Sequence, residues 1–231
     1  MCRIHRLDLL IVLVICLIHL NSGDNYVCDS NLSCGCSLSS TSVTAKIIGG
    51  EIAADNAWGW ALQLLKSGQF SCTAVLISNS YAVTAAHCVD EVTSASKLTI
   101  IAGTNDYSNT NGAGERRTVL QYYIHPNYNA ARSTNDIAVL RFSPLTNTSR
   151  VKFICLPSAG VDPFVLGSNV VVAGWGVTNE NSRDPSPALR QVTVEVLAPG
   201  NMYCRRSYVT DITVQMCAGD IRGGKGMIDG K

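Results

Sequence analysis

Past its first 23 residues, the sequence contains only two histidines, His87 and His125, and one of them stands in a setting suited to proton transfer. His87 lies in Thr84-Ala85-Ala86-His87-Cys88, and Asp136 directly precedes the apolar run Ile137-Ala138-Val139-Leu140. An imidazole can accept and return a proton near neutral pH, and a carboxylate can hold its tautomer and orientation. Taken singly, His87 could be a structural histidine beside a disulfide, and Asp136 could cap a strand or a turn.

Two further segments make the joint interpretation specific: Lys46-Ile47-Ile48-Gly49-Gly50 and Ala173-Gly174-Trp175-Gly176. Together with the segments around His87 and Asp136, they resemble the trypsin-like (chymotrypsin-family, peptidase S1) secreted serine endopeptidases. The resemblance implies that His87 is the general base and acid and that Asp136 orients it, which is the division of roles described for that family itself. It also implies that His125 lies in a surface turn.

The nucleophile of that family is missing from the sequence. Family members carry a serine in Gly-Asp-Ser-Gly-Gly, which should follow Cys217-Ala218-Gly219, and no Gly-x-Ser-x-Gly occurs in these 231 residues. The resemblance covers nearly everything from residue 46 to 225, and the sequence then continues to Lys231 without the motif. Because neither His87 nor Asp136 forms an acyl-enzyme itself, the chain as written is predicted to be inactive and truncated at the C-terminus of its protease domain.

Three explanations of the missing segment are open. The first is an incomplete gene model or a misspliced transcript of a real protease, since the departure after Lys225 is abrupt. The second is a non-catalytic protease homologue that acts as a protein-binding or regulatory module. The third is a nonfunctional product that misfolds. A binding module predicts a stable, monodisperse domain, whereas a protease parent predicts an encoded continuation with the serine motif.

The N-terminal region is divided into a leader and a pro-segment. Residues 1–23 have a basic start and an apolar run from Leu9 to Leu20 before polar residues, which is typical of a secretory signal peptide. The alternative is a membrane anchor, but this run is shorter than the roughly 20 residues that a spanning helix needs. Residues 24–46 are polar and are interpreted as a pro-segment, and residues 47–231 as the protease domain. The prediction is a secreted, extracellular protein with no membrane association after signal cleavage.

The segment at Lys46 and Ile47 resembles the activation junction of the family. In the family, an activating protease cuts after the basic residue, and the new amino group pairs with the aspartate beside the catalytic serine. The alternative is a lysine that happens to precede a strand. Because the accepting aspartate is missing here, cleavage after Lys46 is not expected to switch on activity.

The cysteines favour an oxidising compartment. Cys2 and Cys16 lie in the leader, and the remaining eight are even in number, which in a secreted chain indicates disulfide bonds. Their spacings do not match a zinc site, so no metal is predicted. The resemblance implies that Cys72 pairs with Cys88, that Cys204 pairs with Cys217, and that Cys155 pairs with Cys34 or Cys36, which leaves the other to meet Cys28.

Short β-like runs separated by turns follow Ile47 and predict an all-β fold. The expected strands are Phe70–Ile77, Tyr81–Thr84, Lys97–Ala102, Thr118–Ile124, Ile137–Phe142, Val170–Ala173 and Gln191–Leu197. The resemblance implies two packed antiparallel six-stranded barrels of the trypsin-like fold, with the active site between them and the second barrel incomplete. An unclosed barrel should expose apolar core positions such as Val170, Val172, Val192 and Val194.

Charge and composition limit the classes of molecule that are expected to bind. The net charge is +1 and Lys and Arg do not cluster, so nucleic acid and anionic lipid are not expected as ligands. No cofactor is implied. The resemblance implies a protein or peptide substrate and an activating protease that acts at Lys46. The preference at the cleaved residue stays undetermined, because the specificity residue belongs to the missing segment.

Overall fold

The structure of the chain is a computed structural model. It describes residues 24–26, 31, 33–39, 41–43, 50–107, 114–146, 149–177, 184–202, 204, 211 and 213–219. The predicted signal peptide, Cys28, the junction at Lys46 and Ile47, and the stretch after residue 219 therefore lie outside the described residues. Among the residues that are described, no helix is long and apolar enough to cross a membrane.

The described residues are predominantly β-structure, with two short 3₁₀ turns, η1 (Ala86–Cys88) and η2 (Ala95–Lys97). The strands are β1 (Asp24–Tyr26), β2 (Thr41–Val43), β3 (Glu51–Ile52), β4 (Ala61–Lys66), β5 (Gln69–Ser78), β6 (Tyr81–Thr84), β7 (Leu98–Ala102), β8 (Glu115–Ile124), β9 (Ala138–Phe142), β10 (Asn169–Gly174), β11 (Arg190–Val196) and β12 (Ala218–Gly219).

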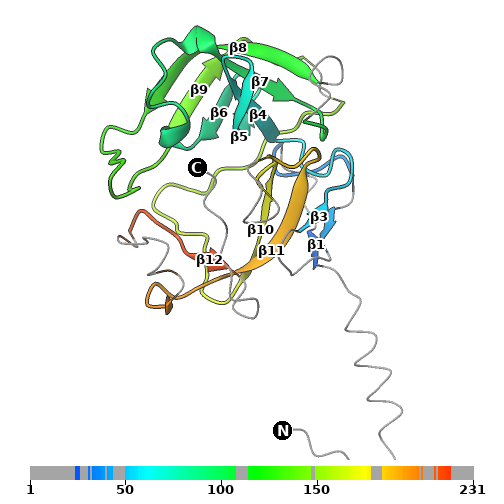
Figure 1. The fold of residues 1–231 in the computed structure, drawn as a ribbon. Helices are drawn as coiled ribbons and strands as arrows, with labels where there is room; N and C mark the ends of the chain where they lie inside the picture. The colour runs from blue at the N-terminus through cyan, green and yellow to red at the C-terminus, as the bar shows by residue number, and fades with distance from the viewer. Residues whose placement is uncertain are drawn as a thin grey trace, which may run out of the picture.

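Six antiparallel strands close into a barrel in the order β4-β5-β6-β9-β8-β7, seen in the upper half of Figure 1. The pairing of β4 with β7, with Lys66 opposite Leu98 and Gln63 opposite Ile101, joins the ends of the sheet. Closure leaves no free strand edge within the barrel. The interior is filled by fully buried branched side chains that include Leu62, Leu76 and Leu140.

A second, four-stranded sheet lies below this barrel in Figure 1. Its strands run in the order β10-β11-β12, and β3 pairs with β11 through Arg190 opposite Ile52 and Gln191 opposite Glu51. Its strands do not close into a barrel within the described residues. The predicted fold class, all-β with one complete barrel and a partial second one, is therefore confirmed.

The expectation that the open sheet leaves its valines exposed was wrong in part. Val194 is 7% exposed and buried, while Val170, Val172 and Val192 are half-buried. Thr193, on the opposite face of β11, is also buried. Both faces of β11 are therefore covered in part, so this strand does not divide into one buried and one solvated face.

The described residues of the predicted pro-segment pack against the rest of the chain. Val43, at the end of β2, is fully buried and belongs to a second apolar cluster with Trp58, Trp175 and Leu189. Upstream of it, the Ser37 hydroxyl donates to the Asn56 carbonyl at 2.9 Å. This part of the chain contributes a core side chain, although its polar composition gave no sign of one.

The barrel interior predicts a clear mutational contrast. Leu140→Ala should lower the free energy of unfolding by about 2.7–5.0 kcal/mol, because it leaves a cavity in a fully packed interior. Leu120→Ala, on the neighbouring strand but 58% exposed, should change it by less than about 0.5 kcal/mol. Urea unfolding followed by tryptophan fluorescence measures both. Equal losses in the two variants would contradict the barrel as described.

Candidate active site

His87 is held in a tight turn at the end of β6. The turn η1 follows Thr84, and Ala86 and Cys88 on either side of His87 are buried. The backbone N–H groups of Val89 and Asp90 both donate to the Ala86 carbonyl at 2.9 Å. Burial of its neighbours points the imidazole outward, where its side chain is 46% exposed.

Asp136 approaches from the start of β9. Asn135 before it has a left-handed backbone with φ 52°, which asparagine tolerates better than most residues. The Ile137 N–H donates to the Asn135 carbonyl at 2.8 Å and closes this turn. The Asp136 side chain is only 23% exposed, so its carboxylate is partly shielded from water.

The Asp136 carboxylate makes two hydrogen bonds to His87. The His87 backbone N–H donates to Oδ1 at 2.9 Å, and His87 Nδ1 lies 2.7 Å from Oδ2. An ionised carboxylate only accepts hydrogen bonds, so the Nδ1 nitrogen carries the proton in the neutral imidazole. The lone pair of that imidazole is then on Nε2, which is the arrangement of a general base with an orienting acid.

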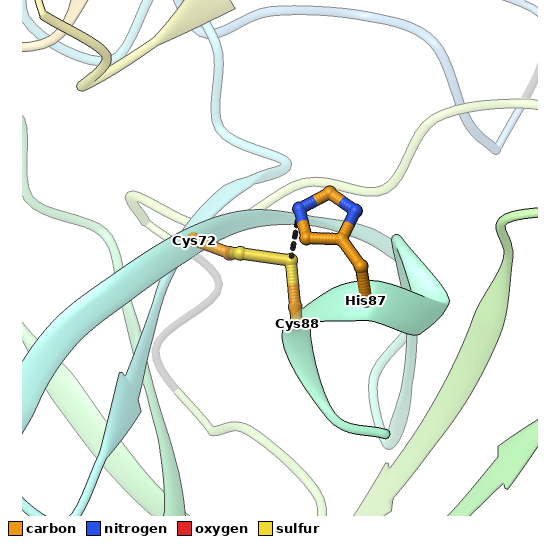
Figure 2. A group of neighbouring side chains, drawn as sticks. All are labelled: Cys72, His87 and Cys88. Carbon is orange, nitrogen blue, oxygen red and sulfur yellow. Dashed lines mark hydrogen bonds between the residues drawn. A yellow bond between two sulfur atoms is a disulfide. The ribbon is translucent and has the colours of Figure 1, made fainter. Parts of the chain in front are cut away.

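A disulfide between Cys72 of β5 and Cys88 lies beside the imidazole. Figure 2 shows the two cysteines with the His87 ring, whose Nε2 is 3.6 Å from Cys88 Sγ. These three side chains place metal-type ligand atoms within 4.8 Å of one another. The sulfurs are bonded to each other and supply no thiolate, so the group does not form a metal centre while the disulfide is intact.

Three of the disulfide bonds that the family resemblance implied are present. Besides Cys72–Cys88, the structure has Cys204–Cys217 and Cys34–Cys155. The choice that the sequence left open for Cys155 falls on Cys34. Cys36 is also disulfide-bonded, while the Cys28 with which it was expected to pair lies outside the described residues.

The remaining predicted site residues divide into two groups. Lys46 and Ile47, and the positions where the family carries its nucleophile, lie outside the described residues. His125 lies directly after β8 in a turn, where its backbone N–H donates to the Ile137 carbonyl at 3.0 Å and its Nδ1 accepts from Asn127 N–H at 3.2 Å. It therefore supports the loop that carries Asp136, and no hydrogen bond joins it to His87 among the described residues.

The turn and the hydrogen bond that hold Asp136 in place were not predicted from the sequence. The Asn135 side chain donates from Nδ2 to the Asn127 carbonyl at 3.0 Å, which ties the turn to the far side of its loop. An asparagine directly before the aspartate was the available signal, since asparagine favours both left-handed backbone and side-chain to backbone hydrogen bonds.

A closed antiparallel barrel, a partial second sheet and a His–Asp pair beside a disulfide define a protein of the serine-protease type. The family model described as Trypsin matches residues 47–230. Trypsin-1 of Astacus astacus is 35% identical over 164 residues, which cover 69% of this chain and 67% of that protein. Brachyurin of Leptuca pugilator is 30% identical over 185 residues, covering 80% and 78%.

Kallikrein 1-related peptidase b27 of Mus musculus is 31% identical over 200 residues, which cover 81% of this chain and 73% of that protein. The chain therefore belongs to the trypsin-like family of serine endopeptidases. Members of this family act on protein or peptide substrates.

The disulfide beside His87 generates a prediction. Replacing Cys72 and Cys88 together with alanine should lower the free energy of unfolding by on the order of 3 kcal/mol, because the bond closes a loop with a sequence separation of 16. It should also shift the NMR resonance of the His87 Nδ1 proton, since Cys88 is part of the same turn.

The matched control is the double replacement of Cys204 and Cys217, whose sequence separation is 13. This pair should cost comparable stability and leave the His87 resonance in place. An unchanged resonance in the Cys72 and Cys88 variant would show that the disulfide does not shape the turn.

Proposed function

We propose that His87 is the general base and acid of a serine endopeptidase and that Asp136 orients it. The observation that carries the proposal is the 2.7 Å contact of His87 Nδ1 with Asp136 Oδ2 in a chain of the trypsin-like family. With Nδ1–H held by the carboxylate, Nε2 can take the proton of an attacking serine hydroxyl. It can then return that proton to the leaving amine of a peptide.

The nucleophile has to come from a Gly-Asp-Ser-Gly-Gly segment, which these 231 residues do not contain. The same segment supplies backbone N–H groups for the tetrahedral oxyanion, each worth about 2.7–4 kcal/mol of transition-state stabilisation. The polypeptide of these residues alone is therefore proposed to be catalytically silent. A non-catalytic role in protein binding is the alternative, and the experiments below separate the two.

Secretion is part of the proposal. A basic and apolar leader over residues 1–23 precedes an even set of cysteines, and three disulfides join residues that follow the leader. Disulfides of this density persist in oxidising compartments such as the extracellular space. The leader is proposed to be a signal peptide that is removed during export.

We also propose a zymogen whose pro-segment, residues 24–46, is cut after Lys46 by an activating protease. Two observations support a two-chain product: Cys34 is disulfide-bonded to Cys155, and Val43 is fully buried among core side chains. β3, which begins at Glu51, is already paired with β11, so this strand needs no new pairing after the cut. The cut piece is thus expected to stay on the protein.

Limited trypsin digestion of the secreted chain tests this. N-terminal sequencing should find a new terminus at Ile47, and the 24–46 piece should leave only after reduction, because Cys34–Cys155 retains it. Lys46→Gln is the matched control and should not be cut at this bond. Release of the piece without a reductant, or resistance of this bond while the rest is digested, would contradict the proposal.

A fluorophosphonate probe tests the catalytic part. It should leave the 231-residue chain unlabelled. It should label an extended chain, in which the residues after 219 are replaced by the corresponding C-terminal segment of a crustacean trypsin. Labelling of the extended chain should be lost in His87→Ala, because the serine then has no base.

Two outcomes would overturn the catalytic proposal. Labelling of the short chain that depends on His87 would reveal an unrecognised nucleophile within it. An extended chain that folds but stays unlabelled would show that the His–Asp pair does not serve a serine, and would favour the non-catalytic role.

A further inference from the structure

Tyr128 joins the two backbone segments that carry the His–Asp pair. Its hydroxyl donates to Asp90 Oδ2 at 3.1 Å. Asp90 belongs to the His87 turn, because its N–H donates to the Ala86 carbonyl at 2.9 Å. Tyr128 itself belongs to the loop between β8 and β9 that ends at Asp136. One side-chain hydrogen bond therefore joins the two segments without involving the imidazole.

The loop transmits the position of Tyr128 to Asp136 through a short chain of hydrogen bonds. The Tyr128 N–H donates to the His125 carbonyl at 2.9 Å, and the His125 N–H donates to the Ile137 carbonyl at 3.0 Å. The Asn135 side chain donates to the Asn127 carbonyl at 3.0 Å from the other side of the loop. Movement of the Tyr128 ring would thus displace the backbone on both sides of Asp136.

The ring of Tyr128 is packed in place and its hydroxyl stays protonated. Its half-buried ring packs against the barrel core cluster, which includes Cys88, Val89 and Val92 of the His87 turn and its continuation. Partial burial, then the hydrogen bond to Asp90 and the charges of Asp90 and Asp136, raise the pKa of Tyr128 from 10.0 to about 12. The hydroxyl stays protonated, and so remains a donor, throughout the physiological pH range.

We propose that Tyr128, through its hydrogen bond to Asp90, is a positioning residue that holds the His87 turn and the Asp136 loop at the separation the His–Asp contact requires. The inference rests on the proposed function in that the pair is the catalytic one, but the geometry it concerns can be measured without catalysis. Among the described residues Tyr128 makes no hydrogen bond to the imidazole or to the Asp136 carboxylate, and the proposed effect is exerted through the two backbone segments that carry them.

The proposal is tested by observing the His87 Nδ1 proton by NMR in the histidine-labelled product of the 231-residue chain after secretion and removal of the leader. Tyr128→Phe removes one oxygen atom and keeps the packed ring. It should move this resonance and speed its exchange with solvent about 2- to 10-fold, the factor that corresponds to one net hydrogen bond. His125→Gln identifies the resonance, because the signal of His87 remains in that variant.

Tyr123→Phe is the matched control. Tyr123 lies on β8, the strand before the loop of Tyr128, and is 49% exposed. Its hydroxyl donates to Gln121 Oε1 of the same strand at 2.6 Å, so it does not join the His87 turn to the Asp136 loop. Loss of the Tyr123 hydroxyl should leave the His87 signal unchanged. Thermal unfolding of each variant checks that a difference in the signal does not reflect loss of the fold.

A double-mutant cycle with Asp90 separates positioning from general packing. Asp90→Ala should reproduce the effect of Tyr128→Phe, the two together should add nothing, and Asp90→Asn should retain most of the wild-type signal because it keeps an acceptor oxygen. An unchanged signal in Tyr128→Phe, or additive effects of the two single variants, would overturn the proposal.

Activity provides a second readout in the extended chain that carries a trypsin C-terminal segment. Tyr128→Phe should lower kcat by about tenfold with little change in KM, since small misplacements of a catalytic group act on the chemical step. If the extended chain is inactive with Tyr128 intact, the proposed function fails. The NMR result on the 231-residue chain still decides the positioning role.

Discussion

The register between β6 and β9 is the constraint on which the candidate site depends. These strands are neighbours in the closed barrel, and Thr84 lies opposite Ala138. Because the pair is antiparallel, the end of β6 and the start of β9 meet at the same rim. His87 comes three residues after Thr84 and Asp136 comes two residues before Ala138, so the two side chains converge without a long loop.

A slip of one residue in this register would destroy the site as well as the core. A slip of β9 against β6, for example, would move Leu140 from the barrel interior to its outside, because side chains alternate along a strand. The apolar interior therefore fixes the register, and the register places the His–Asp pair. The relative position of His87 and Asp136 therefore depends on the packing of apolar side chains that take no part in the chemistry.

A second group of interactions surrounds Trp58 and Trp175, where the segments that flank the barrel strands meet the open sheet. Trp58 Nε1–H donates to Gln191 Oε1 at 2.7 Å, and Gln191 Nε2 donates to Glu51 Oε1 at 2.8 Å. Trp175 Nε1–H donates to the Asn105 carbonyl at 2.9 Å. Each of the two buried indole N–H groups thus donates to a partner that is distant in sequence. The hydrogen bond satisfies the buried polar atom and helps to fix the relative placement of the two sheets.

The part of the fold that sequence predicted follows from local pattern. β5, β6 and β9 were expected within two residues at each end, because alternation and turn residues mark them. β4 was missed, since five of its six residues are buried: Leu62 and Leu64 face the barrel core, while Ala61 belongs to the second cluster. A strand buried on both faces has no alternation to detect.

The candidate site also has a part that was predicted from local sequence and a part that was not. His87 and Asp136 were identified as candidates because their motifs are contiguous in sequence. The Tyr128 hydrogen bond to Asp90 joins residues separated by 38 positions, and neither has a distinctive local context. Such a contact follows from the closed barrel bringing the loop after β8 against the turn after β6, and no sequence period reports it.

The His–Asp pair belongs wholly to the first barrel and its rim. The strands, turns and disulfide that hold it lie between Cys72 and Phe142, and the hydrogen bonds that fix it join residues of that range. The base is therefore positioned independently of whatever element carries a nucleophile. In an enzyme built this way, the barrel presents a preformed proton acceptor, and the second sheet and its continuation have only to bring a serine hydroxyl to His87 Nε2.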